Sequence, residues 1–280
     1  MTPQEHIEGL DQPALRHTVQ IAGLQVMWRC FGDRNSPATP LVLLHGGHGS
    51  WLHWLRNLEA LATERAVWVA DLPGFGDSDD VANMGDFSEL VALTRASLDA
   101  LLGATTSVHV VGFSFGALAA AQLAAARDHV QSLALLGPAG HGTERRMPEE
   151  LVNWRRARSQ EELEEMQRHN LALLMLYKPE SIDDLALEIH LRACEAARFY
   201  SKAFSRSANL QKTLERCAMP TLLLWGEHDL TAVPDALAAS LCEGTPHRTS
   251  QIIRDAGHWV QFEAASQTNQ MLRDWIQRNQ

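Results

Sequence analysis

Four short apolar runs constrain the fold of this chain more than any other feature of its sequence. The runs LVLL, VWVA, VHVVG and PTLLLWG lack the alternation of apolar and polar residues that marks a strand with one face in water. Continuous apolar strands are typical of parallel sheets covered on both faces. Because helix-length amphipathic segments lie between most of the later runs, the sequence predicts an α/β protein with a mostly parallel central sheet flanked by helices.

Eight strands are expected in this sheet. The first two are separated only by Ala22, Gly23 and Leu24, which favours an antiparallel hairpin at the start of the chain. The expected strands are Thr18–Ile21, Gln25–Phe31, Leu41–His45, Val67–Ala70, Val108–Gly112, Val130–Leu136, Thr221–Trp225 and Ser250–Arg254.

The regular alternation of strands and helices stops after the sequence GPAG. From residue 141 to residue 207 the composition is densely helical, as in EELEEMQRHNLALLML, and no convincing strand is found. We therefore expect an α/β core formed by residues 1–140 and 208–280, with residues 141–207 inserted as a helical cap.

Composition and charge narrow the possible partners. Lys and Arg total 24 against 34 for Asp and Glu, so the net charge of −10 would repel a nucleic acid backbone. The four cysteines form no CxxC pair, which favours a reducing compartment over a disulfide framework or a thiolate metal site. No signal peptide and no run of about 20 apolar residues is present, so a cytoplasmic protein without membrane partners is expected. A homo-oligomer is compatible with the sequence.

The pentapeptide Gly112-Phe113-Ser114-Phe115-Gly116 is the strongest functional motif. It follows the run VHVV and opens an alanine-rich helix, which is the context of a G-x-S-x-G nucleophile elbow. Glycine is needed where strand and helix would otherwise collide, and the sharp turn forces Ser114 into a strained conformation that exposes its hydroxyl. A passive serine in a glycine turn is the structural alternative.

A second glycine-rich loop, His45-Gly46-Gly47-His48-Gly49, follows the run LVLL. The backbone N–H groups of Gly47 and Phe115 could together hold an oxyanion. Metal binding by His45, His48 and His53 is a weaker reading because no Cys, Asp or Glu stands at ligand spacing, and His45 is expected to be a structural hydrogen-bonder.

An acid and a histidine follow the last two expected strands, in the sequences WGEHD and DAGHW. Both therefore lie at strand carboxyl ends, where open α/β sheets bind their ligands. The chain order is Ser114, Asp229 and His258. Glu227 is the alternative acid, and Asp229 or His258 could instead be a turn or core residue.

These motifs resemble, as a set and in order, the α/β-hydrolase fold superfamily over the whole chain. The four markers are HGGHG, DLPGFGDSD at residues 71–79, GFSFG, and WGEHD with AGHW. The resemblance implies Ser114 as nucleophile, His258 as general base, Asp229 as its orienting acid, and Gly47 and Phe115 as the oxyanion hole. It also implies that Asp71 and Gly74 are structural turn residues and that no metal or cofactor is required.

The resemblance leaves the reaction open. A serine nucleophile disfavours the haloalkane dehalogenase and epoxide hydrolase branches, whose chemistry needs a carboxylate. The segment GHWVQFE resembles the ring-cleavage carbon-carbon hydrolases. Two departures count against that branch, because its loop usually reads HGxGPGA and its elbow usually carries asparagine where Phe113 stands.

Six residues are candidates for contacts with the substrate. Trp51, Phe113, Phe115 and Trp259 adjoin the expected catalytic groups, where they could line an apolar pocket or fill the core. In the cap, Arg192 and Arg198 could hold a substrate carboxylate or face solvent.

The leading hypothesis is a serine hydrolase that cleaves an ester or related acyl bond of a small apolar substrate. A carbon-carbon hydrolase acting on a ring-cleavage dienoate is the alternative. A third hypothesis is a small-molecule receptor that keeps the fold and the Ser-His-Asp residues but has little turnover.

Overall fold

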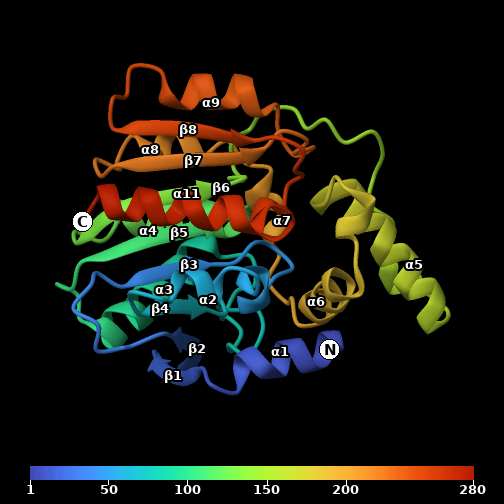
Figure 1. Ribbon diagram of the computed structural model, residues 1–280, viewed down its shortest axis with the longest axis horizontal. Coiled ribbons are helices and arrows are strands. Elements are labelled where there is room, and N and C mark those ends of the chain that lie inside the picture. The colour runs from blue at the N-terminus through green and yellow to red at the C-terminus, as the bar shows by residue number, and fades with distance from the viewer.

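Eight strands form a single sheet in the computed structural model, which describes residues 1–280 (Figure 1). The spatial order of the strands is β1-β2-β4-β3-β5-β6-β7-β8. The β1–β2 and β2–β4 pairs are antiparallel, and every other neighbouring pair is parallel. All eight expected strands are confirmed, with bounds β1 Leu15–Ile21, β2 Leu24–Phe31, β3 Leu41–Leu44, β4 Val67–Ala70, β5 Val108–Phe113, β6 Val130–Leu136, β7 Thr221–Gly226 and β8 Arg248–Ile253.

The hairpin of β1 and β2 turns on two residues, Ala22 and Gly23. Their φ angles are +51° and +84°, while Ile21 and Leu24 are already paired. Two residues with positive φ make a turn whose twist matches that of the flanking strands.

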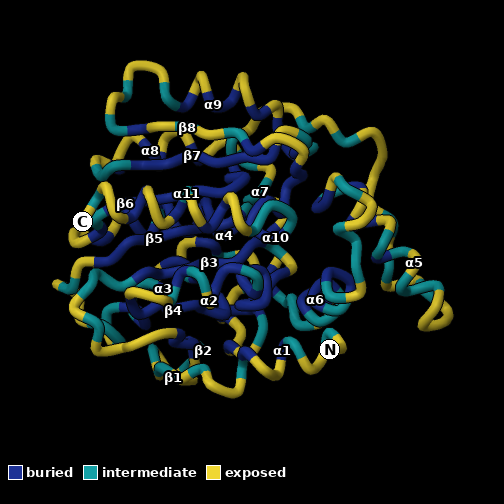
Figure 2. The backbone as a smooth tube through the Cα atoms, viewed as in Figure 1, coloured by how far each residue is buried: buried dark blue, intermediate teal, exposed yellow.

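Strand β3 shows why the apolar runs do not alternate. Val42 and Leu44 belong to one buried apolar cluster, whereas Leu41 and Leu43 belong to a second cluster. Because successive side chains of a strand point to opposite faces, both faces of the sheet are covered and every position is apolar. The tube in Figure 2 is accordingly dark along the central strands.

Helices supply the residues that cover these two faces. Helices α3, α4, α8 and α9 contribute to the cluster that contains Val42, and α1, α2, α6, α10 and α11 contribute to the other. Their bounds are α1 Pro3–Asp11, α2 Leu58–Leu61, α3 Phe87–Leu102, α4 Phe115–Ala125, α5 Gln160–Asn170, α6 Asp184–Glu195, α7 Ser201–Ser205, α8 Leu210–Leu214, α9 Pro234–Cys242, α10 Val260–Glu263 and α11 Ala265–Arg278.

The segment between β6 and β7 contains helices and no strand, as the composition of residues 141–207 predicted. Helix α5 continues into one π-helical turn at Leu171–Met175. Figure 1 shows α5 and α6 beside one end of the sheet rather than over either of its faces.

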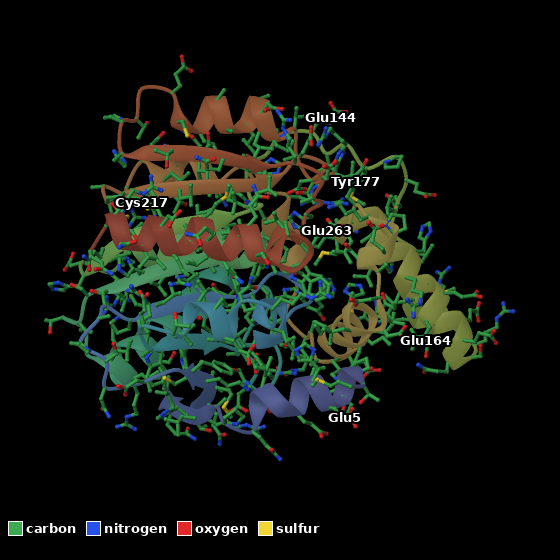
Figure 3. The ribbon with its side chains drawn as sticks, viewed as in Figure 1. Glu5, Glu144, Glu164, Tyr177, Cys217 and Glu263 are labelled. Carbon is green, nitrogen blue, oxygen red and sulfur yellow. The ribbon has the colours of Figure 1, made fainter.

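Two side chains of the core fasten this inserted segment. The Glu263 carboxylate accepts hydrogen bonds from the backbone N–H groups of Tyr177 and Lys178, at 3.0 Å and 2.7 Å, and from that of Gly257 at 2.6 Å. Figure 3 labels Glu263 and Tyr177 where the two chain segments meet. Arg56 forms an ion pair with Asp183 at 2.6 Å. The inserted segment is therefore tied to the end of α10 through Glu263 and to the segment before α2 through Arg56.

The strand order also determines where a ligand can bind. The chain runs from β3 to β4 on one side of β3 and then crosses to β5 on its other side. Such a reversal leaves a crevice at the carboxyl ends of the two strands, which is where open α/β sheets place their sites. The loop after β3 and the turn after β5 both open at this point.

Candidate active site

The turn after β5 holds Ser114 in a strained conformation. Its φ is +54° and ψ is −116°, a region that non-glycine residues rarely adopt. A Cβ on Gly112 would lie 2.4 Å from the Gly116 oxygen, and one on Gly116 would lie 2.1 Å from the His45 oxygen. Both glycines are therefore required by close backbone approach, as the motif predicted.

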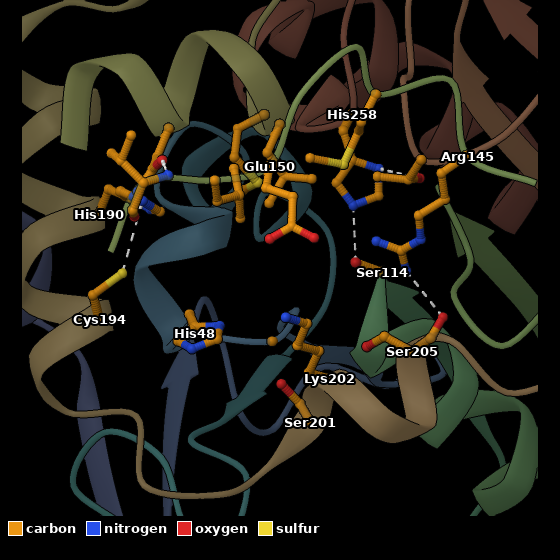
Figure 4. A pocket seen from close by; sticks show the side chains of 18 of the residues that line it. His48, Ser114, Arg145, Glu150, His190, Cys194, Ser201, Lys202, Ser205 and His258 are labelled. Atoms are coloured by element: carbon orange, nitrogen blue, oxygen red, sulfur yellow. Dashed lines mark hydrogen bonds between the residues drawn. The ribbon is translucent and has the colours of Figure 1, made fainter. Parts of the chain in front are cut away.

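Three side chains from different loops form a hydrogen-bonded relay, seen in part in Figure 4. His258 Nε2 lies 2.8 Å from Ser114 Oγ, and His258 Nδ1 lies 2.7 Å from Asp229 Oδ2. The structure thus brings together the three residues expected from the sequence. In this arrangement the imidazole can accept the serine proton while the carboxylate holds Nδ1–H in place.

The Asp229 carboxylate is buried and fully hydrogen-bonded. Its Oδ1 accepts hydrogen bonds from the Thr231 N–H at 2.8 Å and from the Thr231 hydroxyl at 2.7 Å. Burial opposes ionisation of this carboxyl, but attraction to His258 and the hydrogen bonds from His258 and Thr231 outweigh it and lower the pKa. Asp229 is therefore held as a carboxylate.

The loop that carries Asp229 is clamped from the inserted segment by Arg146. Its guanidinium donates to the Ala232 oxygen at 2.8 Å and to the Asp229 oxygen at 2.9 Å. Glu227, the alternative acid, is exposed and accepts a hydrogen bond from the Asp255 N–H instead of reaching His258. The geometry therefore favours Asp229.

Gly137, which follows β6, makes room for the histidine. Its φ is +48°, and a Cβ at this position would lie 2.9 Å from His258 Nδ1 and 3.1 Å from Asp229 Oδ2. Any side chain here would press on the imidazole where it meets the carboxylate.

Two backbone N–H groups beside Ser114 have no acceptor within the protein. These are the amides of Gly47 and of Phe115, the first residue of α4. A Cβ on Gly46 would lie 3.2 Å from the Ser114 Cβ, so the loop after β3 packs against the elbow. The amides and the helix dipole of α4 can stabilise negative charge on a reacting oxygen.

The histidines after β3 make backbone contacts rather than a metal site. His45 Nδ1 lies 2.8 Å from the Gly46 oxygen, and its Nε2 accepts the Leu72 N–H at 3.0 Å. His53 Nδ1 accepts the Gly46 N–H at 3.2 Å. The side chains of His45, His48 and His53 do not bring one ring nitrogen each close enough together to bind a single metal ion. The carboxylate of Asp71 accepts the Trp51 N–H, which fits the structural role expected for it.

A cavity of about 640 Å³ opens above Ser114. Nine of its 27 lining residues are hydrophobic, so the cavity combines apolar surface with polar and charged groups. Most of the lining comes from the inserted segment, including Arg145, Lys202 and Arg206. None of these three cations forms an ion pair within the chain.

Several expected substrate contacts require correction. Phe113 does line the cavity, but Trp51 and Trp259 are buried in the core and do not. Trp51 stacks on Phe31, and the Trp259 indole donates to the His53 oxygen at 3.0 Å. The Phe115 side chain likewise packs among aromatic rings of the core.

The two candidate arginine anchors do not line the cavity either, which agrees with the alternative that they face solvent. Arg192 pairs with Glu188 on its own helix and contacts Gln4 of α1. Arg198 pairs with Asp80 and donates to the Ser78 oxygen. Both guanidinium groups are therefore occupied on the outside of the molecule.

Comparison with known proteins agrees with the fold and the motif order. Residues 39–265 match the family described as the alpha/beta hydrolase fold. The chain therefore belongs to the α/β-hydrolase family.

Among relatives, a 2-hydroxy-6-oxononadienedioate/2-hydroxy-6-oxononatrienedioate hydrolase of Cupriavidus pinatubonensis is 31% identical, with 87% of this chain and 89% of the relative covered. The dihydrolipoyllysine-residue acetyltransferase component of the acetoin cleaving system of Pseudomonas putida is 30% identical over 93% of this chain and 69% of its own length. An esterase structure from Rhodococcus sp. ECU1013 superposes with a TM-score of 0.79 at 22% identity, covering 95% of this chain and 99% of that one. At that identity the likeness concerns the fold.

None of the helices combines the length and the apolar composition that a membrane span requires.

Proposed function

We propose that the protein is a serine hydrolase that cleaves an ester or related acyl bond of a small molecule. The observation that supports this most is the relay from Ser114 Oγ through His258 to Asp229, with distances of 2.8 Å and 2.7 Å. Short hydrogen bonds from a serine to an imidazole, and from that imidazole to a buried carboxylate, form the arrangement that activates a serine hydroxyl.

The reaction follows from these groups. His258 Nε2 takes the Ser114 proton as Oγ attacks the carbonyl carbon, and the amides of Gly47 and Phe115 hold the oxyanion. Collapse of the tetrahedral intermediate breaks the acyl–oxygen bond, and the leaving alcohol takes the proton from His258. Water then attacks the acyl-enzyme with His258 again as base, which releases the acid and restores Ser114.

Residues 141–207 act in this proposal as a cap that selects the substrate. They supply most of the cavity wall, whereas the core supplies the reacting groups. The mixed lining suits a small substrate that carries apolar surface together with a polar group besides the acyl bond.

The proposal is tested by turnover of short p-nitrophenyl esters. Ser114→Ala should lower kcat by about three orders of magnitude or more and leave the thermal unfolding midpoint nearly unchanged. His258→Ala should lose a similar factor, and the double variant should be no worse than either single variant. Ligand binding without multiple turnover would overturn the proposal in favour of a receptor.

Carbon-carbon hydrolysis of a ring-cleavage dienoate is the second candidate. Two observations favour it: a relative at 31% identity is a dienedioate hydrolase, and Arg145, Lys202 and Arg206 offer unpaired positive charge to a carboxylate. We expect a higher kcat/KM for a short or aryl ester than for a 2-hydroxy-6-oxo-dienoate. A higher kcat/KM for loss of the dienoate absorbance would reverse this choice, and its collapse in Lys202→Met would identify a carboxylate anchor.

A further inference from the structure

One wall of the cavity is buried, polar and uncharged. It consists of Gln167 and Asn170 on α5 and His190 and Cys194 on α6, which we call the α5–α6 wall. All four residues are buried, with 0% of Gln167 and 7% of His190 exposed. Figure 4 shows His190 and Cys194 across the cavity from Ser114.

Three polar atoms of this wall make no well-formed hydrogen bond in the protein, although the Gln167 side chain lies close enough to the Cys194 thiol to favour its thiolate slightly. They are Nε2 and Oε1 of Gln167 and Nδ1 of His190. The neighbouring amide of Asn170, in contrast, is satisfied, because it exchanges hydrogen bonds of 2.9 Å and 3.0 Å with the backbone of Val152. Gln167 and His190 are the two residues with such unpartnered atoms that line the cavity. Unpaired buried polar atoms are costly, so a group entering the cavity gains by pairing with them.

The α5–α6 wall also carries no charge near neutral pH. Burial, with a smaller contribution from His48, lowers the pKa of His190 to about 4. Burial likewise raises the pKa of the Cys194 thiol to about 12. Most charged residues of the cavity, including Glu150, Arg155 and Lys202, are exposed, and Arg145 is half-buried. The charged side chains and the uncharged polar side chains of the α5–α6 wall thus lie on different parts of the cavity lining.

We propose that the α5–α6 wall is a subsite that binds an uncharged hydroxyl group of the substrate. A hydroxyl oxygen accepts a hydrogen bond from Gln167 Nε2, and its hydrogen is donated to Gln167 Oε1 or His190 Nδ1. His190 Nε2 lies 3.7 Å from Cys194 Sγ, and in either tautomer Nδ1 finds a match, because a hydroxyl both donates and accepts. This inference rests on the proposed function, in which Ser114 attacks the acyl bond of the same substrate.

Other substituents fit the wall less well. A methyl group leaves all three atoms unpaired, and a ketone pairs only with donors and leaves Gln167 Oε1 without a partner. A carboxylate would lose its hydration among uncharged groups, with no buried cation to replace the water. Sites that hydrogen-bond a substrate hydroxyl discriminate strongly against the analogue that lacks it.

The experiment compares p-nitrophenyl esters of 3-phenylpropanoic acids that differ only in the para substituent: hydroxyl, methyl, acetyl or carboxylate. The wild-type enzyme should favour the hydroxyl ester over the methyl ester by about tenfold to a hundredfold in kcat/KM. Equal values, or a preference for methyl, acetyl or carboxylate, would overturn the subsite.

Gln167→Met removes the amide but keeps the length of the side chain, and it should abolish the hydroxyl preference. Gln261→Met is the matched control, because Gln261 is also fully buried with both amide atoms unpartnered but does not line the cavity. This variant should keep the preference. If Gln167→Met keeps it as well, the proposal fails. If Gln167→Met does not fold, His190→Leu provides the same comparison, and a preference unchanged there would also refute the subsite.

A binding measurement separates this inference from the proposed function. Ser114→Ala protein is titrated with the four free acids, which need no turnover. Tighter binding of the hydroxyl acid, with no hydrolysis of any ester by the wild type, would support the subsite and overturn the hydrolase. Hydrolysis of the esters, with equal binding and equal kcat/KM across the series, would support the hydrolase and overturn the subsite.

Discussion

Replacing Asp229 by asparagine should do more than remove a charge, because Thr231 dictates how the amide is oriented. The Thr231 N–H and hydroxyl both donate to Oδ1, at 2.8 Å and 2.7 Å, so the amide oxygen will stay at that position. The amide NH₂ then faces His258 Nδ1, which must accept. The imidazole proton is consequently forced onto Nε2, where it blocks uptake of the Ser114 proton.

The size of the effect follows from the cost of turning the amide round. The flipped orientation restores the productive tautomer but points NH₂ at the Thr231 N–H, whereas the Thr231 hydroxyl can turn and accept. One unpaired buried donor costs about 1–3 kcal/mol, so the flip lowers the rate by about fivefold to 150-fold. Loss of the charge that stabilises the imidazolium adds to this. We expect Asp229→Asn to lower kcat for a p-nitrophenyl ester by about 10³-fold to 10⁴-fold.

Two further variants test the reasoning itself. Thr231→Val in the Asp229→Asn background keeps the backbone N–H that orients the amide, so it should not restore kcat. Glu227→Gln should matter far less than Asp229→Asn, because Glu227 does not reach His258. A kcat within tenfold of the wild type for Asp229→Asn, or a larger loss for Glu227→Gln, would refute the assignment. A double variant with kcat restored to within tenfold of the wild type would refute the role given to the Thr231 N–H.

Three other predictions follow from the same geometry. Gly137→Ala should lower kcat by about tenfold to a hundredfold by displacing His258. Gly244→Ala is its control, since it shares a positive φ but meets nothing within 4 Å, and equal kcat in both variants would contradict the role of Gly137. Because the pKa of Asp229 is lowered from 3.8, its carboxylate stabilises the fold above about pH 4. The unfolding free energy difference between wild type and Asp229→Asn in urea should therefore shrink as pH falls below 4, and a constant difference would be inconsistent. Arg192→Ala and Arg198→Ala should change kcat/KM less than about threefold for anionic esters. A much larger loss of kcat/KM would show that these arginines contribute to substrate binding.

The strands and the elbow could be predicted because local sequence determines them. A strand buried on both faces must be apolar at every position, and Gly112 and Gly116 are demanded by contacts of 2.4 Å and 2.1 Å that no side chain could make. Asp229 and His258 could be predicted as neighbours of Ser114 because each lies on a loop within five residues of the end of a strand. These features depend on a few neighbouring residues rather than on the packing of distant segments.

The residues that the sequence did not reveal depend on tertiary packing. Arg146 and Gly137 act on the relay from segments far along the chain, and nothing in their immediate sequence indicates it. Thr231 has a weak local signal, since a threonine two residues after an aspartate often hydrogen-bonds to it. Helix α1, which begins with a capping box of Thr2 and Glu5, was also missed.

Helix α6 shows why Arg192 does not reach the cavity. His190 and Cys194 are four residues apart and share the buried face, whereas Arg192 lies between them in sequence and so points away from it. Helical spacing could have excluded Arg192 once His190 and Cys194 were known to face the cavity. Which face of a cap helix meets the cavity is set by its packing on the core, so the sequence alone left this open.

The most direct test of the account asks which atom of the protein is the nucleophile. Wild-type protein is treated with a fluorophosphonate, and the modified residue is identified by tandem mass spectrometry of its peptides. We predict one adduct, on Ser114, which Ser114→Ala abolishes and His258→Ala slows strongly, because the imidazole must accept the serine proton. An adduct on another serine of the cavity, such as Ser201 or Ser205, or no adduct at all, would contradict the assignment of Ser114 as the nucleophile.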